Sequence, residues 1–327
     1  MPHIDAHVLA LDEEAEIERI AGAIREMLGR RLRRRGLVVG ISGGIDSAVC
    51  AALSVRAVGR DKVLGLLMPE TDSASTTTPR GQWVAEQLGI EFITEDISAA
   101  LRAVGCYARR DAAIREVFPE YDGAWPHKLV IRGGTKGRLN HFALVVQRPD
   151  GTEHEARLPL KAYLQIVAAT NFKQRIRKTL EYFHADRLNY AVVGTPNRLE
   201  YDQGFFVKNG DGAADLKPIA HLYKTQVYAL AARLDIPEEV RAALPTTDTY
   251  SLAQGQDEFY FALPYHQMDL ALWGLNHDVP AAELSGVIGL SAEQVAWVYR
   301  DIMAKRRTTA YQHLKSLLVE PVTQIGA

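Results

Sequence analysis

The sequence predicts an α/β protein in which a doubly wound parallel sheet is flanked by helices and carries a small inserted antiparallel β-excursion. Four short apolar runs, at 37–41, 62–69, 91–94 and 190–194, have the composition of buried strands. Helical stretches separate these runs, and the rhythm is broken over residues 121–160. In a doubly wound sheet, ligands bind at the carboxyl ends of the strands. Candidate functional residues are therefore expected directly after each strand.

Residues 11–30 are predicted to form an amphipathic helix ahead of the first strand. Acidic residues crowd its first turn, and apolar residues recur at helical spacing. These residues are Ile17, Ile20, Ala21, Ile24, Met27 and Leu28. The basic run at 30–35 is interpreted as a solvated helix end rather than a phosphate contact, because cations are favoured at a helix C-terminus.

A polar loop rich in serine and threonine follows the second strand at 71–78, and a helix is expected around 82–88. The excursion is expected to contain two or three antiparallel strands among 128–132, 141–146 and 152–160, with a turn-rich stretch at 133–137. Two interpretations of the excursion stay open. It is either a solvated hairpin or a segment that covers the ligand site or extends a subunit contact.

Composition places the chain among ordinary globular proteins of 327 residues, with 47% hydrophobic and 24% charged residues. The formal net charge of −2 argues against a nucleic-acid partner, because no overall basic field is present. Cys50 and Cys106 have neither metal-ligand nor disulfide-framework spacing, which suits a reducing compartment. Neither a signal peptide nor an apolar stretch of membrane-spanning length is visible. The sequence therefore predicts a cytoplasmic protein with no membrane partner.

The motif Ser-Gly-Gly-Ile-Asp-Ser at 42–47 lies between the first strand and an alanine-rich helix. Such a turn directs backbone N–H groups and the positive end of a helix dipole at one point, which favours a bound phosphate. Asp46 adds a carboxylate that Mg²⁺ would accept. The motif lacks the Gly-Lys-Ser/Thr ending of a Walker loop and the G-x-G-x-x-G spacing of a dinucleotide fingerprint. The alternative is a turn that only joins strand to helix.

Polar and glycine residues gather again between 171 and 225. Residues 171–177 are expected to open a helix with Lys173 and Arg177 on one face, and residues 194–200 follow the fourth strand. A glycine-bent acidic loop spans 208–215, and residues 218–225 are expected to start another helix. Together these segments predict a polar pocket for a large, multiply charged ligand.

The order of these motifs resembles that of the NAD synthetases, members of the ATP pyrophosphatase superfamily with a Rossmann-like sheet. The motifs are SGGIDS, NFKQRIR, GTPNRLE, FVKNGDGAAD, LYKTQV, LPTTD, the pair DE at 257–258 and KRR at 305–307. They cover residues ~37 to ~307 apart from 121–160, with their order and spacing kept.

The resemblance implies a role for each matching residue. ATP would be bound by Gly40, Ile41, Ser42, Gly43, Gly44, Ile45, Asp46, Ser47, Thr195, Lys224 and Thr246. Mg²⁺ would be bound by Asp46 and Glu200. The acceptor, nicotinic acid adenine dinucleotide (deamido-NAD), would be held by Arg175, Lys208, Asp215 and Lys305. Asp211 would act beside the reacting carboxylate, as a group that binds ammonium or takes a proton.

The activity implied is ATP- and Mg²⁺-dependent amidation of deamido-NAD to NAD, with an acyl-adenylate intermediate and release of AMP and pyrophosphate. Only 36 residues precede the first strand, too few for a glutaminase domain, so the whole chain 1–327 is interpreted as one synthetase domain that uses ammonia. A separate glutamine amidotransferase is not indicated. The family is homodimeric, which makes a homodimer the expected state.

Three departures from the family pattern are present: Gln174 where alanine is usual, Ala304 where histidine is common, and the excursion itself. Other ATP pyrophosphatases share the first motif. A tRNA-modifying enzyme is disfavoured by the charge and the scattered cysteines, and a nucleotide-sensing module would not need Glu200, Asp211 and Lys224. The main alternative is a GMP-synthetase-like amidoligase.

Overall fold

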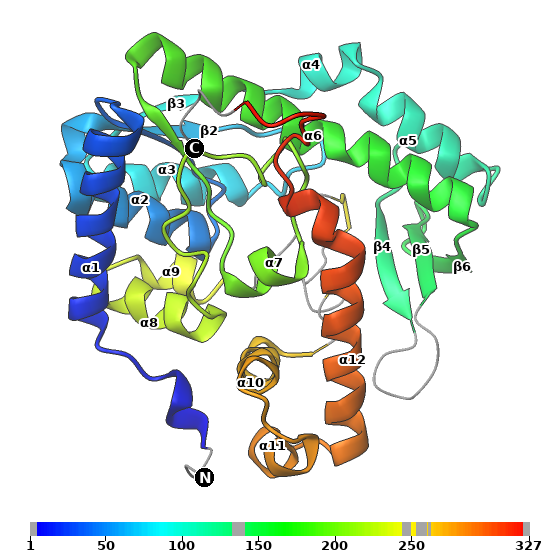
Figure 1. The fold of residues 1–327 in the computed structure, drawn as a ribbon. Helices are drawn as coiled ribbons and strands as arrows, with labels where there is room; N and C mark the ends of the chain where they lie inside the picture. The colour runs from blue at the N-terminus through cyan, green and yellow to red at the C-terminus, as the bar shows by residue number, and fades with distance from the viewer. Residues whose placement is uncertain (1–4, 133–140, 244–249, 253–259, 261–262, 323–327) are drawn as a thin grey trace.

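The computed structural model describes residues 5–132, 141–243, 250–252, 260 and 263–322. Its centre is a four-stranded sheet in the order β3-β2-β1-β7 (Figure 1). The strands are β1 (Leu37–Gly40), β2 (Val63–Leu67), β3 (Glu91–Thr94) and β7 (Ala191–Val193). All three neighbouring pairs are parallel, with Leu37 opposite both Val63 and Ala191. The four predicted strands and the parallel sheet are confirmed.

Helices cover both faces of this sheet, as the doubly wound prediction requires. Leu37 and Val39 of β1 join a core formed with α1 (Glu13–Glu26), α2 (Ile45–Val58) and α8 (Lys224–Arg233). Val38 points to the opposite face, where it packs with Ala185 of α6 (Leu160–Leu188). Strand alternation thus divides the apolar side chains of β1 between two cores.

Helix boundaries differ from the sequence prediction at two places. α3 (Thr77–Leu88) begins earlier than the expected 82–88, because Pro79 is tolerated in a first helical turn. Residues 171–177 do not open a helix but lie in the middle of the 29-residue α6, which starts directly after Pro159. The third strand of the excursion consequently ends at Arg157.

The N-terminal part follows the prediction more closely. α1 continues into a π-helical turn, η2 (Met27–Leu32), which ends at Arg33 in the left-handed conformation with φ 52°. The Arg34 guanidinium donates to Asn189 Oδ1 at 2.8 Å, so this residue of the basic run fastens the helix end to the C-cap of α6. The remaining N-terminal segments are η1 (Ala6–Leu9), and η3 (Arg60–Lys62) ahead of β2.

The excursion forms the expected antiparallel sheet of three strands, named here the inserted sheet. Its strands are β4 (His127–Arg132), β5 (His141–Gln147) and β6 (Glu153–Arg157). Leu129, Leu144 and Val146 pack on Ile166 of α6 and on α5 (Cys106–Arg115). Figure 1 shows the inserted sheet below one end of these two helices. The predicted turn at 133–137 lies outside the described residues.

The C-terminal region is helical and has its own core. It comprises α10 (Tyr265–Asn276), α11 (Ala281–Ile288), α12 (Ala292–Thr309) and η5 (Ala310–His313), whereas α9 (Glu238–Arg241) joins the core of the central sheet through Val240. α10 and α12 pack against α7 (Arg198–Gln203), which follows β7, and α11 packs against α10 and α12. α4 (Ser98–Ala103) instead lies near α6. Within the described ranges no helix has both the length and the apolarity needed to span a bilayer.

Candidate active site

A cavity of about 480 Å³ lies at the carboxyl ends of β1, β2 and β7. All eight residues from Gly40 to Ser47 line it, as do Thr195, Glu200, Asp211 and Lys224. The first and last of these residues, Gly40 and Lys224, are more than 180 positions apart in the sequence. The structure therefore gathers most of the predicted nucleotide-binding and catalytic residues around one space.

The loop after β1 has the geometry of an anion-binding turn. α2 starts at Ile45, and Gly44, its N-cap, supplies no side chain to satisfy the first N–H groups. Gly43 has φ +73°, and a Cβ atom there would lie 2.5 Å from the carbonyl oxygen of Thr77. Ser47 Oγ donates to the Gly44 carbonyl at 2.9 Å and accepts from the Ser42 N–H at 3.2 Å, which holds the turn closed.

Asp46 and Lys224 form an ion pair across the cavity floor. The side chain of Asn197 donates to the other Asp46 oxygen at 3.3 Å. Lys224 is the first residue of α8 and is 1% exposed. Although burial opposes it, the charges of Asp46 and Glu200 raise the pKa of Lys224, so the ammonium stays charged inside the protein.

Glu200 contributes a second carboxylate to this cluster. It caps α7 reciprocally with Asn197, whose N–H donates to Glu200 Oε2 at 3.1 Å. Burial, together with the negative charge of Asp46, raises the pKa of Glu200 from 4.5 to about 8. Two carboxylates that repel each other in this way are suited to share a divalent cation.

The donor set fits Mg²⁺ rather than a metal bound entirely by protein. No group of three or more His, Cys, Asp or Glu side chains suited to a metal ion occurs among the described residues. Mg²⁺ commonly takes one or two carboxylates and completes its octahedron with substrate phosphates and water. Asp46 and Glu200, beside a phosphate-binding turn, match that pattern.

Asp211 lies at the wall of the cavity in the glycine-bent loop. Its Oδ1 accepts from the Val207 N–H at 2.8 Å, so the carboxylate also holds this loop in shape. Burial raises its pKa. The buried pair Lys178–Glu181 of α6, with Nζ and Oε2 2.5 Å apart, also lines this part of the cavity.

The four predicted acceptor residues are not among the residues that line the cavity in the described part of the chain. Arg175 Nε donates to the Lys208 carbonyl at 3.3 Å, and Lys208 Nζ donates to the Tyr311 carbonyl at 2.8 Å. Asp215 accepts from the Val192 N–H at 2.7 Å, and Lys305 pairs with Asp301 at 2.7 Å. Thr246 and the pair at 257–258 lie outside the described residues. The roles of these residues stay predictions.

Several residues of the site were missed by sequence reasoning. Asp269, fully buried on α10, accepts from the N–H groups of Lys224 at 3.1 Å and Thr225 at 2.7 Å, and so fixes the start of α8. Its only sequence signal is an acid inside an apolar helix. Phe142 and Tyr163 line the cavity without belonging to any motif.

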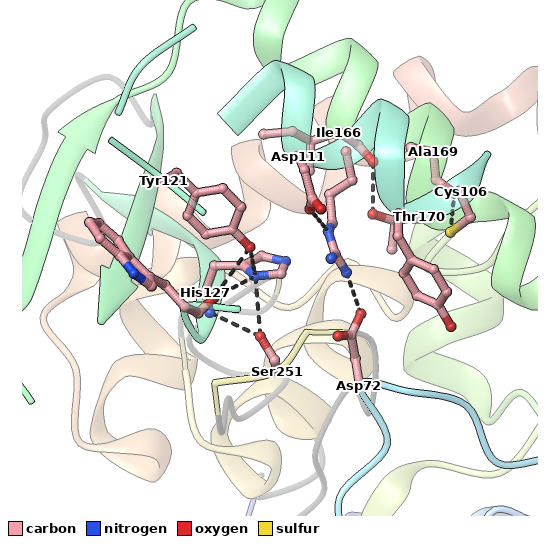
Figure 2. A network of polar contacts seen from close by, with 12 residues as sticks. Asp72, Cys106, Asp111, Tyr121, His127, Ile166, Ala169, Thr170 and Ser251 are labelled. Atoms are coloured by element: carbon pink, nitrogen blue, oxygen red, sulfur yellow. Dashed lines mark hydrogen bonds and ion pairs between the residues drawn. The ribbon is translucent and has the colours of Figure 1, made fainter. Parts of the chain in front are cut away.

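Lys173 belongs to the NFKQRIR motif but has no predicted role there, yet it is 1% exposed and lines the cavity. Its Nζ lies 2.8 Å from Glu70 Oε1 and 2.6 Å from Asp72 Oδ2. Asp72 is also paired with Arg110 of α5, in a network that Figure 2 shows beside the inserted sheet. Against the effect of burial, these two cations lower the pKa of Asp72.

A parallel sheet with an anion-binding turn, two carboxylates and a buried lysine at its carboxyl edge defines an ATP pyrophosphatase type of nucleotide site. The family model described as NAD synthase matches residues 16–117 and 152–311. The chain belongs to the NAD synthase family. The unmatched stretch 118–151 contains β4 and β5 of the inserted sheet.

One relative agrees with this assignment, and two solved structures share the fold. An NH(3)-dependent NAD(+) synthetase of Rhizobium meliloti (strain 1021) is 58% identical over 321 residues, covering 98% of this chain and 96% of the relative. An NH3-dependent NAD synthetase of Campylobacter jejuni, solved with nitrate, shares the fold with a TM-score of 0.62 at 22% identity, covering 95% and 100% of the two chains. An NMN synthetase of Francisella tularensis also shares it, with a TM-score of 0.64 at 22% identity over 94% and 98%.

Proposed function

We propose that this protein catalyses the amidation of deamido-NAD to NAD with ammonia, at the expense of ATP, which becomes AMP and pyrophosphate. The observation that carries the proposal is the convergence of the turn at 42–47, Asp46, Glu200 and Lys224 on one cavity. The family assignment favours this activity over the GMP-synthetase-like alternative, which no comparison supports.

The first step activates the acceptor. A carboxylate oxygen of deamido-NAD attacks the α-phosphorus of ATP, the bond to the β-phosphate oxygen breaks, and pyrophosphate leaves. Lys224 and the N–H groups at the start of α2 stabilise the charge that develops on the phosphates. The turn at 42–47 holds the departing pyrophosphate. Thr195, at the end of β7, contacts ATP, and Thr246 is proposed as a further contact.

Asp46 and Glu200 would hold Mg²⁺, which would neutralise phosphate charge when bound. Glu200 must lose its proton to serve as a ligand, and the cation would favour that ionised form. Before the cation binds, Lys224 offsets the charge of Asp46. The ammonium can turn to a phosphate oxygen once Asp46 has another partner.

The second step forms the amide. Ammonia attacks the acyl carbon, and the bond from that carbon to the bridging oxygen breaks. AMP leaves with this oxygen, which came from the carboxylate, and one proton is released. Asp211 holds the incoming ammonium and accepts its proton, since burial raises the pKa of this carboxyl and makes it a better base. Arg175, Lys208, Asp215 and Lys305 are proposed to hold the rest of the dinucleotide, which lies outside the cavity.

The test is a product analysis with purified protein, deamido-NAD, ATP, Mg²⁺ and an ammonium salt. NAD, AMP and pyrophosphate should form in equal amounts, and the acyl adenylate should accumulate when ammonia is withheld. Formation of ADP would contradict the pyrophosphatase chemistry, and turnover of xanthosine monophosphate in place of deamido-NAD would favour the alternative. The homodimer and the cytoplasmic location stay predictions, to be tested by sedimentation and cell fractionation.

A further inference from the structure

The cavity extends along one face of α6. Tyr163, Val167, Thr170, Gln174 and Lys178 all line it, at the spacing of three or four residues that places side chains on one helix face. From Tyr163 to Lys178 this stripe runs about 22 Å along the helix axis. The cavity is therefore elongated, and its two ends differ in chemistry.

One end of the cavity is charged and the other is aromatic. Lys178 and Glu181 lie at the end nearest the phosphate-binding turn, where a Cβ on Gly40 would be 3.1 Å from Glu181 Oε1. At the other end Phe142 of β5 stacks on Tyr163, with ring centroids 4.1 Å apart and planes inclined by 17°. Val167 and the buried ring of Tyr250 complete this aromatic end.

The inserted sheet that carries Phe142 is firmly held. Figure 2 shows the contacts: His127 Nδ1 lies 3.2 Å from the Tyr121 hydroxyl, and the His127 N–H donates to Ser251 Oγ at 3.0 Å. Arg110 of α5 donates to Asp111 at 2.8 Å and pairs with Asp72 on the loop after β2. Phe142 is thus a fixed wall of the cavity, and it comes from the stretch that the family model does not match.

We propose that this aromatic wall keeps water away from the acyl adenylate, so that ammonia and not water takes the acyl group. The inference rests on the proposed function. The charged end suits the phosphates and also holds Asp211, so the pyridine ring that bears the acyl group extends from there toward the apolar half of the cavity. An acyl adenylate that water reaches is lost as carboxylate, AMP and a proton, and exclusion of water is a recognised way to prevent such a side reaction.

The wall also acts through its shape. Phe142 and Tyr163 present flat apolar faces, and they stack on each other where the inserted sheet meets α6. Burial raises the pKa of Tyr163 to about 12, so its hydroxyl stays neutral at this wall. A smaller side chain at 142 would open the end of the cavity to solvent.

The experiment measures the ratio of AMP released to NAD formed, at limiting ammonia, for the full chain. The wild type should give a ratio near 1, and Phe142→Ala should raise it to about 2 or more because water competes for the intermediate. Phe142→Leu keeps an apolar wall and should restore the ratio. Phe118→Ala is the matched control, because Phe118 packs in the same core but does not line the cavity.

Each remaining outcome decides against the proposal. An unchanged ratio in Phe142→Ala would overturn it, and so would an equal rise in Phe118→Ala, which would report loosening of the inserted sheet. A higher KM for deamido-NAD at an unchanged ratio would make Phe142 a binding contact only. If wild-type protein released no pyrophosphate with deamido-NAD, the proposed function itself would fail, and that failure is visible before any variant is made.

Discussion

Glu200 gives a quantitative test of the electrostatics of the site. Burial and the neighbouring Asp46 raise its pKa from 4.5 to about 8 in the folded protein. Between these two values the folded state keeps a proton that the unfolded state has lost. The contribution of this group to stability is therefore fully present below pH 4.5, and it is lost as the pH rises through 8.

The expected size follows from the two pKa values. At about 1.4 kcal/mol per pH unit, the interval between 4.5 and about 8 corresponds to about 5 kcal/mol. Glu200→Gln removes the titration but keeps an oxygen that can accept from the Asn197 N–H and maintain the helix cap. The free energy of unfolding of the wild type, relative to this variant, should fall by about that amount between pH 4.5 and 9.

Urea unfolding at several pH values, without Mg²⁺, measures this difference directly. Glu283→Gln, at an exposed position on α11, is the control for the loss of a surface carboxylate. A Glu200→Gln curve that runs parallel to the wild type would refute the reasoning. It would mean that Glu200 is ionised in the folded protein at neutral pH. The cost of burying its charge would then be offset by other groups in addition to Lys224.

Three further variants test other parts of the site. Asp46→Asn should abolish pyrophosphate release while circular dichroism shows a folded protein; release at the wild-type rate would contradict the metal assignment. Gly43→Ala should lower the free energy of unfolding by about 2 kcal/mol and weaken ATP binding, because its φ is +73° and a Cβ would meet the Thr77 carbonyl at 2.5 Å. Lys173→Met should cost about 3–5 kcal/mol in urea unfolding, because it removes the cation paired with buried Glu70 and leaves Asp72 with Arg110 alone; a neutral result would contradict this reasoning.

The parallel sheet and the turn at 42–47 could be predicted because their determinants are local. A strand needs a short apolar run, and an anion-binding turn needs glycine at a position with positive φ, here Gly43. The start of α6 was missed because the prediction relied on the same local signals. The polar run at 171–177 was interpreted as the beginning of a helix, whereas the helix begins after Pro159 and continues through that run.

The contents of the cavity were only partly predictable. Asp46, Glu200 and Lys224 each lie in a sequence motif, and the structure brings these residues together. Phe142 and Asp269 reach the site through packing between segments far apart in the sequence, which no local pattern records. The acceptor residues came from the resemblance alone, and their side chains bind other parts of the chain in this structure.

The buried ammonium of Lys173 connects a sequence motif with packing between distant segments. It lies in a family motif on α6, yet it is balanced by Glu70 and Asp72 from the loop after β2. Asp72 in turn pairs with Arg110 of α5, the helix on which the inserted sheet packs. Because an uncompensated charge at this depth is costly, the loop, α5 and α6 must keep one arrangement. The aromatic wall is therefore positioned by the same ion network that borders the catalytic cavity, which explains how an added sheet can serve a reaction whose other residues belong to the family.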